Sequence, residues 1–381
     1  MGALSGVKVV EFAGIGPGPF CCMLLADMGA EVIRIDRAAN VGPAEKSPAT
    51  STTLRGRRNI ALDLKKPDAV AVALDLCAKA DILVEGFRPG VMERLGLGPE
   101  VVFARNARMI YGRMTGWGQD GPIAHTPGHD INYIALTGAL HTIGTKRGGP
   151  VPPLNLVGDY GGGALYMAVG VLAAYIETQR SGKGQIVDTS MVEGAASLMT
   201  PAFGYLAAGQ WIEERESNRL DGGCHHYNVY ETRDGQHVCI GSNEPQFYKE
   251  MLATVGLGDA DLPAQTDRTQ WPAMRARLAA IFKTKTRAEW TAIMEQKEIC
   301  YAPVLSMTEA TRHPQNVARG TFVTVDGVVQ PGPAPRFTRT PSSIERGPAH
   351  AGAHSREVLA DWGIDAGRIE KLVANGAVKQ R

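Results

Sequence analysis

The segment Val7–Arg37, VKVVEFAGIGPGPFCCMLLADMGAEVIRIDR, carries the clearest fold signal in the chain. A short apolar run, Val7–Phe12, is followed by a loop, by a helical pattern over Phe20–Gly29 that ends at a glycine, and by a second apolar run, Ala30–Arg37. A strand, a helix and a strand within about 30 residues are typical of a βαβ unit, in which the two strands are parallel. The segment therefore predicts an α/β fold built on a parallel sheet.

The loop inside this unit does not match a dinucleotide-binding fingerprint. Counting G-x-G-x-x-G from Gly14 and Gly16 puts Pro19 where the third glycine should stand. Pro17 and Pro19 also lack the backbone N–H groups that would hold a pyrophosphate. Asp36 lies where a ribose-binding acid would, but without the glycines NAD binding is disfavoured.

Three further apolar runs continue the strand pattern, namely Asn59–Lys65, Asp81–Phe87 and Ala107–Trp117. Arginines fall at or near the ends of these predicted strands: Arg37, Arg58, Arg88 and Arg113. In a doubly wound sheet, ligands bind at the carboxyl ends of the strands, and arginine suits a phosphate group. A solvated basic rim explains the same pattern equally well.

The composition excludes several classes of function. The chain has 381 residues, 44% apolar and 21% charged, which is typical of a soluble protein with a sizeable core. A formal net charge of +1 argues against non-specific binding to nucleic acid. The six cysteines lack disulfide or metal spacing, so we expect reduced thiols.

Targeting signals and membrane spans are not expected either. The first residues lack a charged stretch followed by an apolar one, and the final Val-Lys-Gln-Arg differs from the peroxisomal Ser-Lys-Leu signal. The longest apolar run, Ala164–Ile176, is shorter than the roughly 20 residues that span a bilayer, so it predicts a buried helix. We therefore expect a cytoplasmic protein without membrane association.

The pattern changes along the chain in a way that predicts two domains. Two apolar runs joined by Arg233-Asp234-Gly235-Gln236 predict a β-hairpin, and three helical patterns follow it, one opened by a Thr286/Glu289 capping box. We expect a large α/β domain from residues 1–190 and 330–381, a linker helix and loop over 191–224, and a small α+β domain with a return segment over 225–329.

Two titratable residues between Gly121 and Thr178 are candidates for acid–base chemistry. His129 lies in a GHDINY run after a Thr-Pro turn, and Asp159 lies in NLVGDYGGG, where a helix N-cap would fall. A histidine and a carboxylate on separate loops can face one substrate from opposite sides. Capping for Asp159, and a structural or solvated role for His129, are the simpler readings. Glycines 161–163 favour a ligand site because they let a ligand approach a helix N-terminus.

Metal binding is not expected at the histidines and cysteines. His125 and His129 are four residues apart, which is a zinc-ligand spacing on a helix. Pro127 and Gly128 lie between them and disfavour a regular helix, so a zinc-binding pair is not expected. Strand pairing could bring a second set of possible metal ligands together. The alternation of side chains along a strand would however place its members on opposite faces of the sheet: Cys224, His225, His226, His237 and Cys239. Glu244, ahead of Pro245, is expected in the first turn of a helix, as a dipole-stabilising acid or a positioned carboxylate.

Taken together, these residues resemble the class III CoA-transferase family. The resemblance runs in collinear order over nearly the whole chain and rests on the following runs: VVEFAGIGPGPFCCMLLADMGAEVIRIDR, RNIALDLK, EGFRPGVMERLGLGP, MTGWGQDGP, GHDINYIALTG, PLNLVGDYGGG, GKGQIVDTSMVEG, DGG and EPQFY. Within the family, the chain is most similar to the α-methylacyl-CoA racemase branch, because racemases carry a histidine where His129 stands and transferases typically carry a tyrosine.

The resemblance implies a set of site residues. His129 and Asp159 would be the two proton-transfer groups, and Glu244 would be an acid that partners the histidine. Contacts with CoA would come from Arg37, Ala61, Leu62, Asp63, Leu64, Arg88, Gly128, His129, Asp130, Ile131, Asn132 and Tyr133. CoA would enter as part of the substrate thioester, and no separate cofactor or metal is implied.

The resemblance also implies an architecture and a reaction. The fold would be a large Rossmann-like domain built from both chain ends plus a small α+β domain, with two chains interlocked as a homodimer and the active site between the large domain of one and the small domain of the other. The reaction would invert C2 of a 2-methylacyl-CoA of fatty-acid or sterol side-chain metabolism. From the residues themselves we expect backbone N–H groups near Gly161, at the start of the helix, to hold the enolate oxygen.

Two other functions remain open at this point. In a CoA transferase, Asp159 would instead act as a covalent nucleophile. A CoA-binding protein without activity is the third possibility. The segment Cys224-His225-His226 after DGG departs from the racemases and leaves the acyl specificity open.

Overall fold

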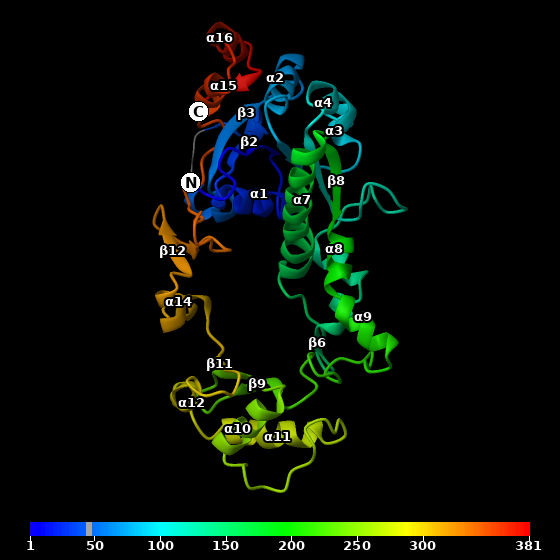
Figure 1. Cartoon of the computed structure of the whole chain (residues 1–381), viewed down its shortest axis with the longest axis vertical. Coiled ribbons are helices and arrows are strands. Elements are labelled where there is room, and N and C mark those ends of the chain that lie inside the picture. The colour runs from blue at the N-terminus through cyan, green and yellow to red at the C-terminus, as the bar shows by residue number, and fades with distance from the viewer. Residues whose placement is uncertain (43–47) are drawn as a thin grey trace. The chain divides into compact units, whose positions relative to one another are not determined.

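The structure, a computed structural model, describes residues 1–42 and 48–381 and divides them into two units. Unit 1 comprises Met1–Thr137, Leu154–Met199 and Ala318–Arg381, and unit 2 comprises Gly138–Pro153 and Thr200–Val317 (Figure 1). These boundaries differ from those of the expected domains. Residues 138–153 belong to unit 2, whereas residues 191–199 and 318–329 belong to unit 1, so the expected linker is divided between the units.

Unit 1 is organised around a sheet in which the described residues form seven strands in the order β14-β3-β2-β1-β4-β5-β8. In chain order the strands are β1 (Lys8–Phe12), β2 (Glu31–Arg37), β3 (Arg57–Leu62), β4 (Ile82–Glu85), β5 (Ile110–Thr115), β8 (Gln185–Ser190) and β14 (Val378–Lys379). All neighbours are parallel except β14, which runs antiparallel to β3. The α/β fold with a parallel-rich sheet is therefore confirmed.

The βαβ unit at the N-terminus is also confirmed. β1 pairs with β2 in parallel, with Val9 opposite Val32. The connecting helix α1 (Pro17–Asp27) begins three residues before the expected start, because a proline in the first turn needs no hydrogen-bond partner for its nitrogen. The turn after α1 contains Gly29 at φ +100°, a conformation that favours glycine.

Helices cover both faces of the sheet. Val10 and Phe12 of β1 face a core shared with α2 (Pro67–Cys77), α4 (Pro99–Arg105), α15 (Ser355–Asp361) and α16 (Ala366–Ala374). Val9 faces the other core, which α1 and α7 (Tyr166–Ser181) complete. The alternation of side chains along β1 thus places two hydrophobic layers against one sheet.

The helix that contains the long apolar run is longer and more exposed than expected. A π-helix, η4 (Leu156–Leu165), runs directly into α7, and together residues 156–181 are long and apolar enough to cross a membrane by length and composition alone. Met167 and Val171 pack against the sheet, but Val169 is 68% exposed and Ile176 55%. The expectation of a fully buried helix is therefore wrong: one side covers the sheet, and the other is left exposed by residues 1–42 and 48–381.

Unit 2 contains the predicted hairpin. β9 (Tyr227–Glu231) and β10 (His237–Gly241) pair antiparallel, and β11 (Tyr301–Pro303) adds to β10. Their core is completed by α10 (Pro245–Thr254), α11 (Trp271–Phe282) and α12 (Arg287–Met294), the last opened by the predicted capping box. Two further elements, α6 (Ala139–Thr142) and the β6–β7 hairpin (Gly144–Thr145, Gly149–Pro150), belong to the same unit.

The remaining elements are short. In unit 1 they are the 3₁₀ turns Ala38–Asn40, Pro48–Thr50 and Thr52–Leu54, the helices α3 (Val91–Arg94), α5 (Asp130–Ala135) and α8 (Met191–Leu198), and the hairpin β12–β13 (Phe322–Val325, Val328–Pro331). In unit 2 they are α9 (Thr200–Ala207) and α13 (Met307–Ala310), and α14 (Pro314–Ala318) ends at the unit boundary.

Candidate active site

A cavity of about 340 Å³ lies in unit 1 at the carboxyl ends of three neighbouring strands, β1, β4 and β5. Its walls are the loops that follow these strands, joined by Asp159 of η4 and by Met191 at the start of α8. The order of the strands reverses between β1 and β4. Ligands of open α/β sheets bind at such a switch point, so the cavity lies where the fold itself predicts a ligand.

His129 faces this cavity from the start of a short helix. It is the residue before α5, its backbone is extended at φ −134°, and its N–H donates to Oδ1 of Asn132 at 3.0 Å. The hydroxyl of Tyr133 donates to the carbonyl of Gly128, and the Tyr133 ring meets Trp117 edge-on with centroids 4.7 Å apart. These contacts fix the backbone around His129 while its imidazole stays exposed.

Asp159 faces the same cavity from the π-helix, and it is not the N-cap. Asn155 is the N-cap of η4, and its side-chain amide donates to Oδ2 of Asp159 at 3.0 Å. The N–H of Asp159 donates to Oδ2 of Asp130 at 2.7 Å. The capping role considered for Asp159 is therefore wrong, because the helix begins one turn earlier than the sequence pattern indicated.

The surroundings of Asp159 favour its protonated form. Burial raises the pKa of the Asp159 carboxyl above its usual range, and the charge of Asp130 raises it further. The hydrogen bond from Asn155 and the nearby His129 act in the opposite direction, but the net shift is upward. A raised pKa favours the protonated form of the carboxyl, which is the form that can donate a proton.

The three glycines after Tyr160 serve packing, which corrects the expectation that they open the backbone to a ligand. A Cβ built on Gly162 would lie 2.5 Å from the backbone nitrogen of Ala195 in α8. One on Gly163 would lie 2.9 Å from side chains of both Pro17 and Met191. Gly161 lies within η4, where a Cβ would be 3.0 Å from the carbonyl oxygen of Leu156. Glycine is needed here for the close approach of α1 and α8.

The structure divides the CoA-contact residues that the resemblance implied into two groups. Gly128, His129, Tyr133 and Arg88 line the cavity, and Arg88 is exposed just after β4. Asp130, Ile131 and Asn132 belong to α5 beside it but are not among its lining residues. Arg37 and the segment 61–64 form a second group, because Arg37 pairs with Leu62 at the ends of β2 and β3. Ala61 and Leu62 are buried in the sheet.

Two of the four arginines considered as phosphate ligands are held in ion pairs instead. Arg58 lies at the start of β3 and contacts Glu31, Glu357 and Asp361. Arg113 lies within β5 and pairs with Glu85 at 3.1 Å and with Glu93 at 2.9 Å. These ion pairs disfavour phosphate binding, one of the two alternatives left open for these arginines. Arg37 and Arg88 are exposed at or just beyond the carboxyl ends of β2 and β4 and remain candidates.

Comparison with known proteins identifies the family. The model of CoA-transferase family III matches residues 4–355. The chain belongs to CoA-transferase family III. α-Methylacyl-CoA racemase of Mus musculus is 44% identical over 380 residues, which cover 99% of this chain and 97% of the relative. α-Methylacyl-CoA racemase of Homo sapiens is 41% identical over 385 residues, 99% of each chain.

A solved structure supports the same fold. The crystal structure of a CaiB/BaiF family protein from Brucella suis superimposes with a TM-score of 0.81 and covers 95% of this chain and 99% of its own. At 24% identity, that likeness bears on the fold alone.

Glu244, the third catalytic candidate in this family III chain, belongs to unit 2. It is the N-cap of α10 and is exposed. Its charge raises the pKa of the neighbouring Cys300 thiol, although burial contributes more to that shift. The expected first-turn position is one residue off, because Pro245 takes the first helical position and Glu244 precedes it.

The cysteines and histidines after DGG are packed within unit 2. His225 is 1% exposed and its Nε2 lies 2.7 Å from the hydroxyl of Tyr248. Burial lowers the pKa of His225 and of His226 to about 4, so both rings are neutral at physiological pH. Within residues 1–42 and 48–381, no group of three or more His, Cys, Asp or Glu side chains is arranged to hold a metal ion.

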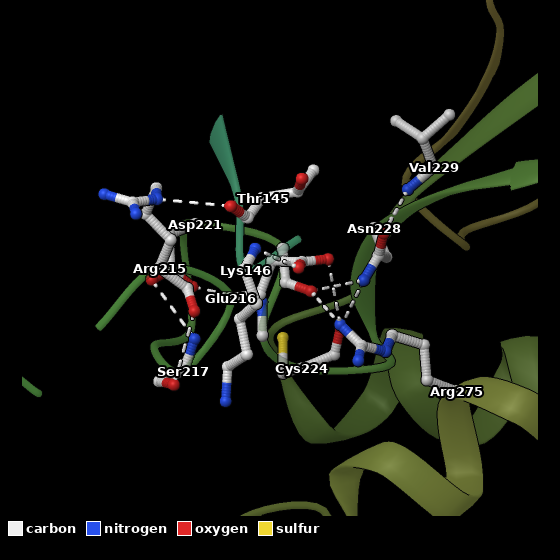
Figure 2. A network of polar contacts seen from close by, with 12 residues as sticks. Thr145, Lys146, Arg215, Glu216, Ser217, Asp221, Cys224, Asn228, Val229 and Arg275 are labelled. Carbon is white, nitrogen blue, oxygen red and sulfur yellow. Dashed lines mark hydrogen bonds and ion pairs between the residues drawn. The ribbon is translucent and has the colours of Figure 1, made fainter. Parts of the chain in front are cut away.

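The DGG motif of this family III chain has a structural role that the sequence did not reveal. The carboxylate of Asp221 accepts hydrogen bonds from the N–H groups of Ser217, Asn218 and Gly223. Figure 2 shows the neighbouring contacts of Glu216. Its Oε2 accepts a hydrogen bond from the backbone N–H of Lys146 at 2.7 Å, and its Oε1 lies 3.6 Å from Nη1 of Arg275. The loop before Cys224 is thereby tied to the β6–β7 hairpin and to α11.

Sequence reasoning missed two residues that line the cavity and one that contacts Asp159 from outside the lining. Gly16 lies so close to Asp159 that a Cβ would be 3.0 Å from its Oδ2. Asn155 bonds the same oxygen. Glu85 is 1% exposed, lines the cavity and accepts the N–H of Phe87 at 2.7 Å. The position of Glu85 at the end of a predicted strand was the one available signal.

Proposed function

We propose that this chain is an α-methylacyl-CoA racemase, which inverts C2 of a 2-methylacyl-CoA thioester. The observation that carries the proposal is the placement of His129 and Asp159 on separate elements around one cavity. The named racemases at 41–44% identity over nearly the full chain support the same substrate class.

The chemistry begins with the weak acidity of the hydrogen at C2. Loss of this proton gives a thioester enolate, and the electron pair of the C–H bond moves toward the carbonyl oxygen. In this direction of the reaction His129 acts as the base and takes the proton from one face, and Asp159 acts as the acid and returns one to the other face. Positioned acid–base groups of this kind contribute roughly 10²–10⁴-fold each.

The raised pKa of Asp159 fits this cycle. A raised pKa favours the protonated carboxyl that this direction of the reaction requires. After one inversion the imidazole is charged and the carboxyl is ionised, and the reverse reaction or exchange with water restores the starting state. Removing and returning a proton leaves the oxidation state of the substrate unchanged, so the reaction needs no redox cofactor.

The expected donors to the enolate oxygen require revision. The Gly161 N–H was expected to serve, but Gly161 lies within the π-helix near the carbonyl of Leu156. The N–H of Asp159 is bonded to Asp130. Donors to the oxygen are therefore to be sought elsewhere around the cavity.

A second candidate function is CoA transfer, with Asp159 as a nucleophile that forms an acyl anhydride and then a CoA thioester. The family model that matches the chain bears the name of that reaction. His129 distinguishes the two, because covalent transfer through a carboxylate does not require an imidazole on the facing wall. An inactive CoA-binding protein would bind CoA and catalyse neither reaction.

Exchange of the C2 hydrogen with deuterated water is the deciding experiment. A pure 2-methylacyl-CoA enantiomer is incubated with enzyme in D₂O, and deuterium incorporation is followed together with optical inversion. Exchange with inversion supports the racemase. Thioesterification of an added free acid, with acyl trapping on Asp159 and without exchange, would instead establish the transferase, and CoA binding without either reaction would establish the third possibility.

We also propose that the enzyme works in the cytoplasm as an interlocked homodimer, in which Glu244 of one chain partners His129 of the other. The apolar side of α7 that stays exposed in the single chain supports an oligomer.

A further inference from the structure

Asp130 lies between the two proton-transfer candidates. It is the first residue of α5, directly after His129, and it is 6% exposed. Its Oδ2 accepts the backbone N–H of Asp159 at 2.7 Å. One buried carboxylate therefore links the segment that carries the imidazole to the helix that carries the catalytic carboxyl.

Gly158 shows how closely these two segments approach. A Cβ at this position would lie 2.6 Å from Oδ2 and 2.9 Å from Cγ of Asp130. The φ angle of Gly158 is not in the left-handed region, so its backbone conformation does not require glycine. The absence of a side chain is needed for the carboxylate of Asp130 to reach the N–H of Asp159.

The charge of Asp130 also reaches the site. It raises the pKa of Asp159 and that of Tyr133, in both cases in addition to the larger effect of burial. Its second oxygen, Oδ1, is buried and has no hydrogen-bond partner among residues 1–42 and 48–381. Leaving a carboxylate oxygen buried and unpaired is unfavourable, so stability alone does not explain an aspartate here.

We propose that Asp130 is a positioning residue for proton transfer. Its carboxylate fixes the backbone of Asp159 relative to His129 through the hydrogen bond that it accepts from the Asp159 N–H. The inference rests on the proposed racemase function, and it assigns to the Asp130 side chain a role other than the CoA contact that the resemblance implied.

Two substitutions separate the tether from the charge. Asp130→Ala removes both, and we expect kcat to fall about 10²-fold with KM changed less than about threefold, because small displacements of reacting groups have effects of that size. In Asp130→Asn the amide oxygen can still accept the N–H of Asp159, so kcat should stay within about tenfold of wild type. In both variants the pH midpoint assigned to Asp159 should move to lower pH, because a like charge has been removed.

Gly158→Ala provides an independent probe that leaves Asp130 in place. The new methyl group displaces the carboxylate, so kcat should fall as it does in Asp130→Ala. In the double variant the two losses should not add, because both remove the same contact. Thermal unfolding of each variant shows whether it is folded. If Asp130→Ala does not fold, the pH profile of Asp130→Asn still tests the proposal.

Three results would overturn the inference. The first is an unchanged kcat and pH profile in Asp130→Ala. The second is an equal fall in kcat in both Asp130 variants without a shift of the pH profile. The third is a raised KM at constant kcat, which would indicate a contact with CoA. Failure of the proposed function has a different signature, since wild-type enzyme would then show no exchange of the C2 hydrogen.

Discussion

The backbone of Gly16 lies against the carboxylate of Asp159. A Cβ at Gly16 would be 3.0 Å from Oδ2 of Asp159, and Gly16 has φ +68° and ψ −119°, which L-residues rarely adopt. The glycine before α1 thus both starts the helix and leaves space for the catalytic candidate across the cavity.

Substitution of this glycine should therefore damage both stability and activity. For Gly16→Ala we expect a loss of about 1–3 kcal/mol in the free energy of unfolding, because the backbone is strained, and about a 10²-fold lower kcat, because Asp159 is displaced. Denaturant unfolding and racemisation rates measure the two effects. Gly204→Ala is the control, since a Cβ at Gly204 meets nothing within 4 Å and Gly204 is not a lining residue of the cavity. Equal behaviour of the two variants would contradict the prediction.

Removal of either proton-transfer group should affect hydrogen exchange differently in the two enantiomers of the substrate. We expect His129→Ala and Asp159→Asn each to lower racemisation by roughly 10²–10⁴-fold. Each variant should still exchange the C2 hydrogen of the enantiomer whose proton the remaining group removes. Separate assays of the two enantiomers in D₂O measure this. His125→Ala, an exposed histidine outside the cavity lining, should behave as wild type. Equal exchange losses for both enantiomers would contradict the two-base scheme.

The amide of Asn155 should set the pH dependence of the reaction. Its hydrogen bond lowers the pKa of Asp159, so in Asn155→Ala that pKa should rise further. Where Asp159 acts as the base, the acidic limb of kcat/KM should move to higher pH; where it acts as the acid, the basic limb should move the same way. The pH profiles of both enantiomers test this, and a downward or absent shift would be inconsistent with the contact.

Subunit complementation tests the proposed dimer. Co-expression of His129→Ala and Glu244→Gln chains with different tags gives heterodimers. If each site combines His129 of one chain with Glu244 of the other, a heterodimer has one intact site, and random pairing restores about a quarter of all sites. If both residues act within one chain, co-expression restores none. Co-expression of two His129→Ala chains is the control.

Glu85 should make stability depend on pH. Burial raises its pKa from 4.5 to about 7, against the opposing effect of Arg113. The folded chain therefore holds this proton more tightly than the unfolded chain, and stability should fall as the pH rises from 4.5 to 7, by on the order of 3 kcal/mol. Glu85→Gln should flatten this slope, whereas Glu93→Gln should reduce it less, because the charge of Glu93 is only a minor cause of the raised pKa of Glu85. Denaturant unfolding at several pH values measures the difference.

The sequence predicts local features of this chain well. The βαβ unit, the Asp234-Gly235 hairpin and the Thr286 cap depend on neighbours within a few residues, and all three are confirmed. The place of the cavity follows from the strand order, and its two acid–base candidates followed from the family resemblance together with their loop positions.

Features that depend on distant partners were missed or misjudged. Arg58 binds Glu357 and Asp361, about 300 positions away, which no local pattern indicates. The glycines after Asp159 looked like a ligand approach, but their neighbours are α1 and α8. The hydrogen bond from Asp159 to Asp130 joins residues 29 positions apart in irregular surroundings and left no periodic signal.

The π-helical pitch of η4 determines where Asp159 points. In such a helix each turn contains more residues than in an α-helix, so the chain fits an additional residue between Asn155 and the start of α7. Deleting one residue there would tighten the coil and rotate the preceding side chains by about 100° about the axis relative to α7. The number of residues in η4 thus sets the direction of the Asp159 side chain. Insertions or deletions in η4 should therefore be tolerated less well than substitutions of its side chains.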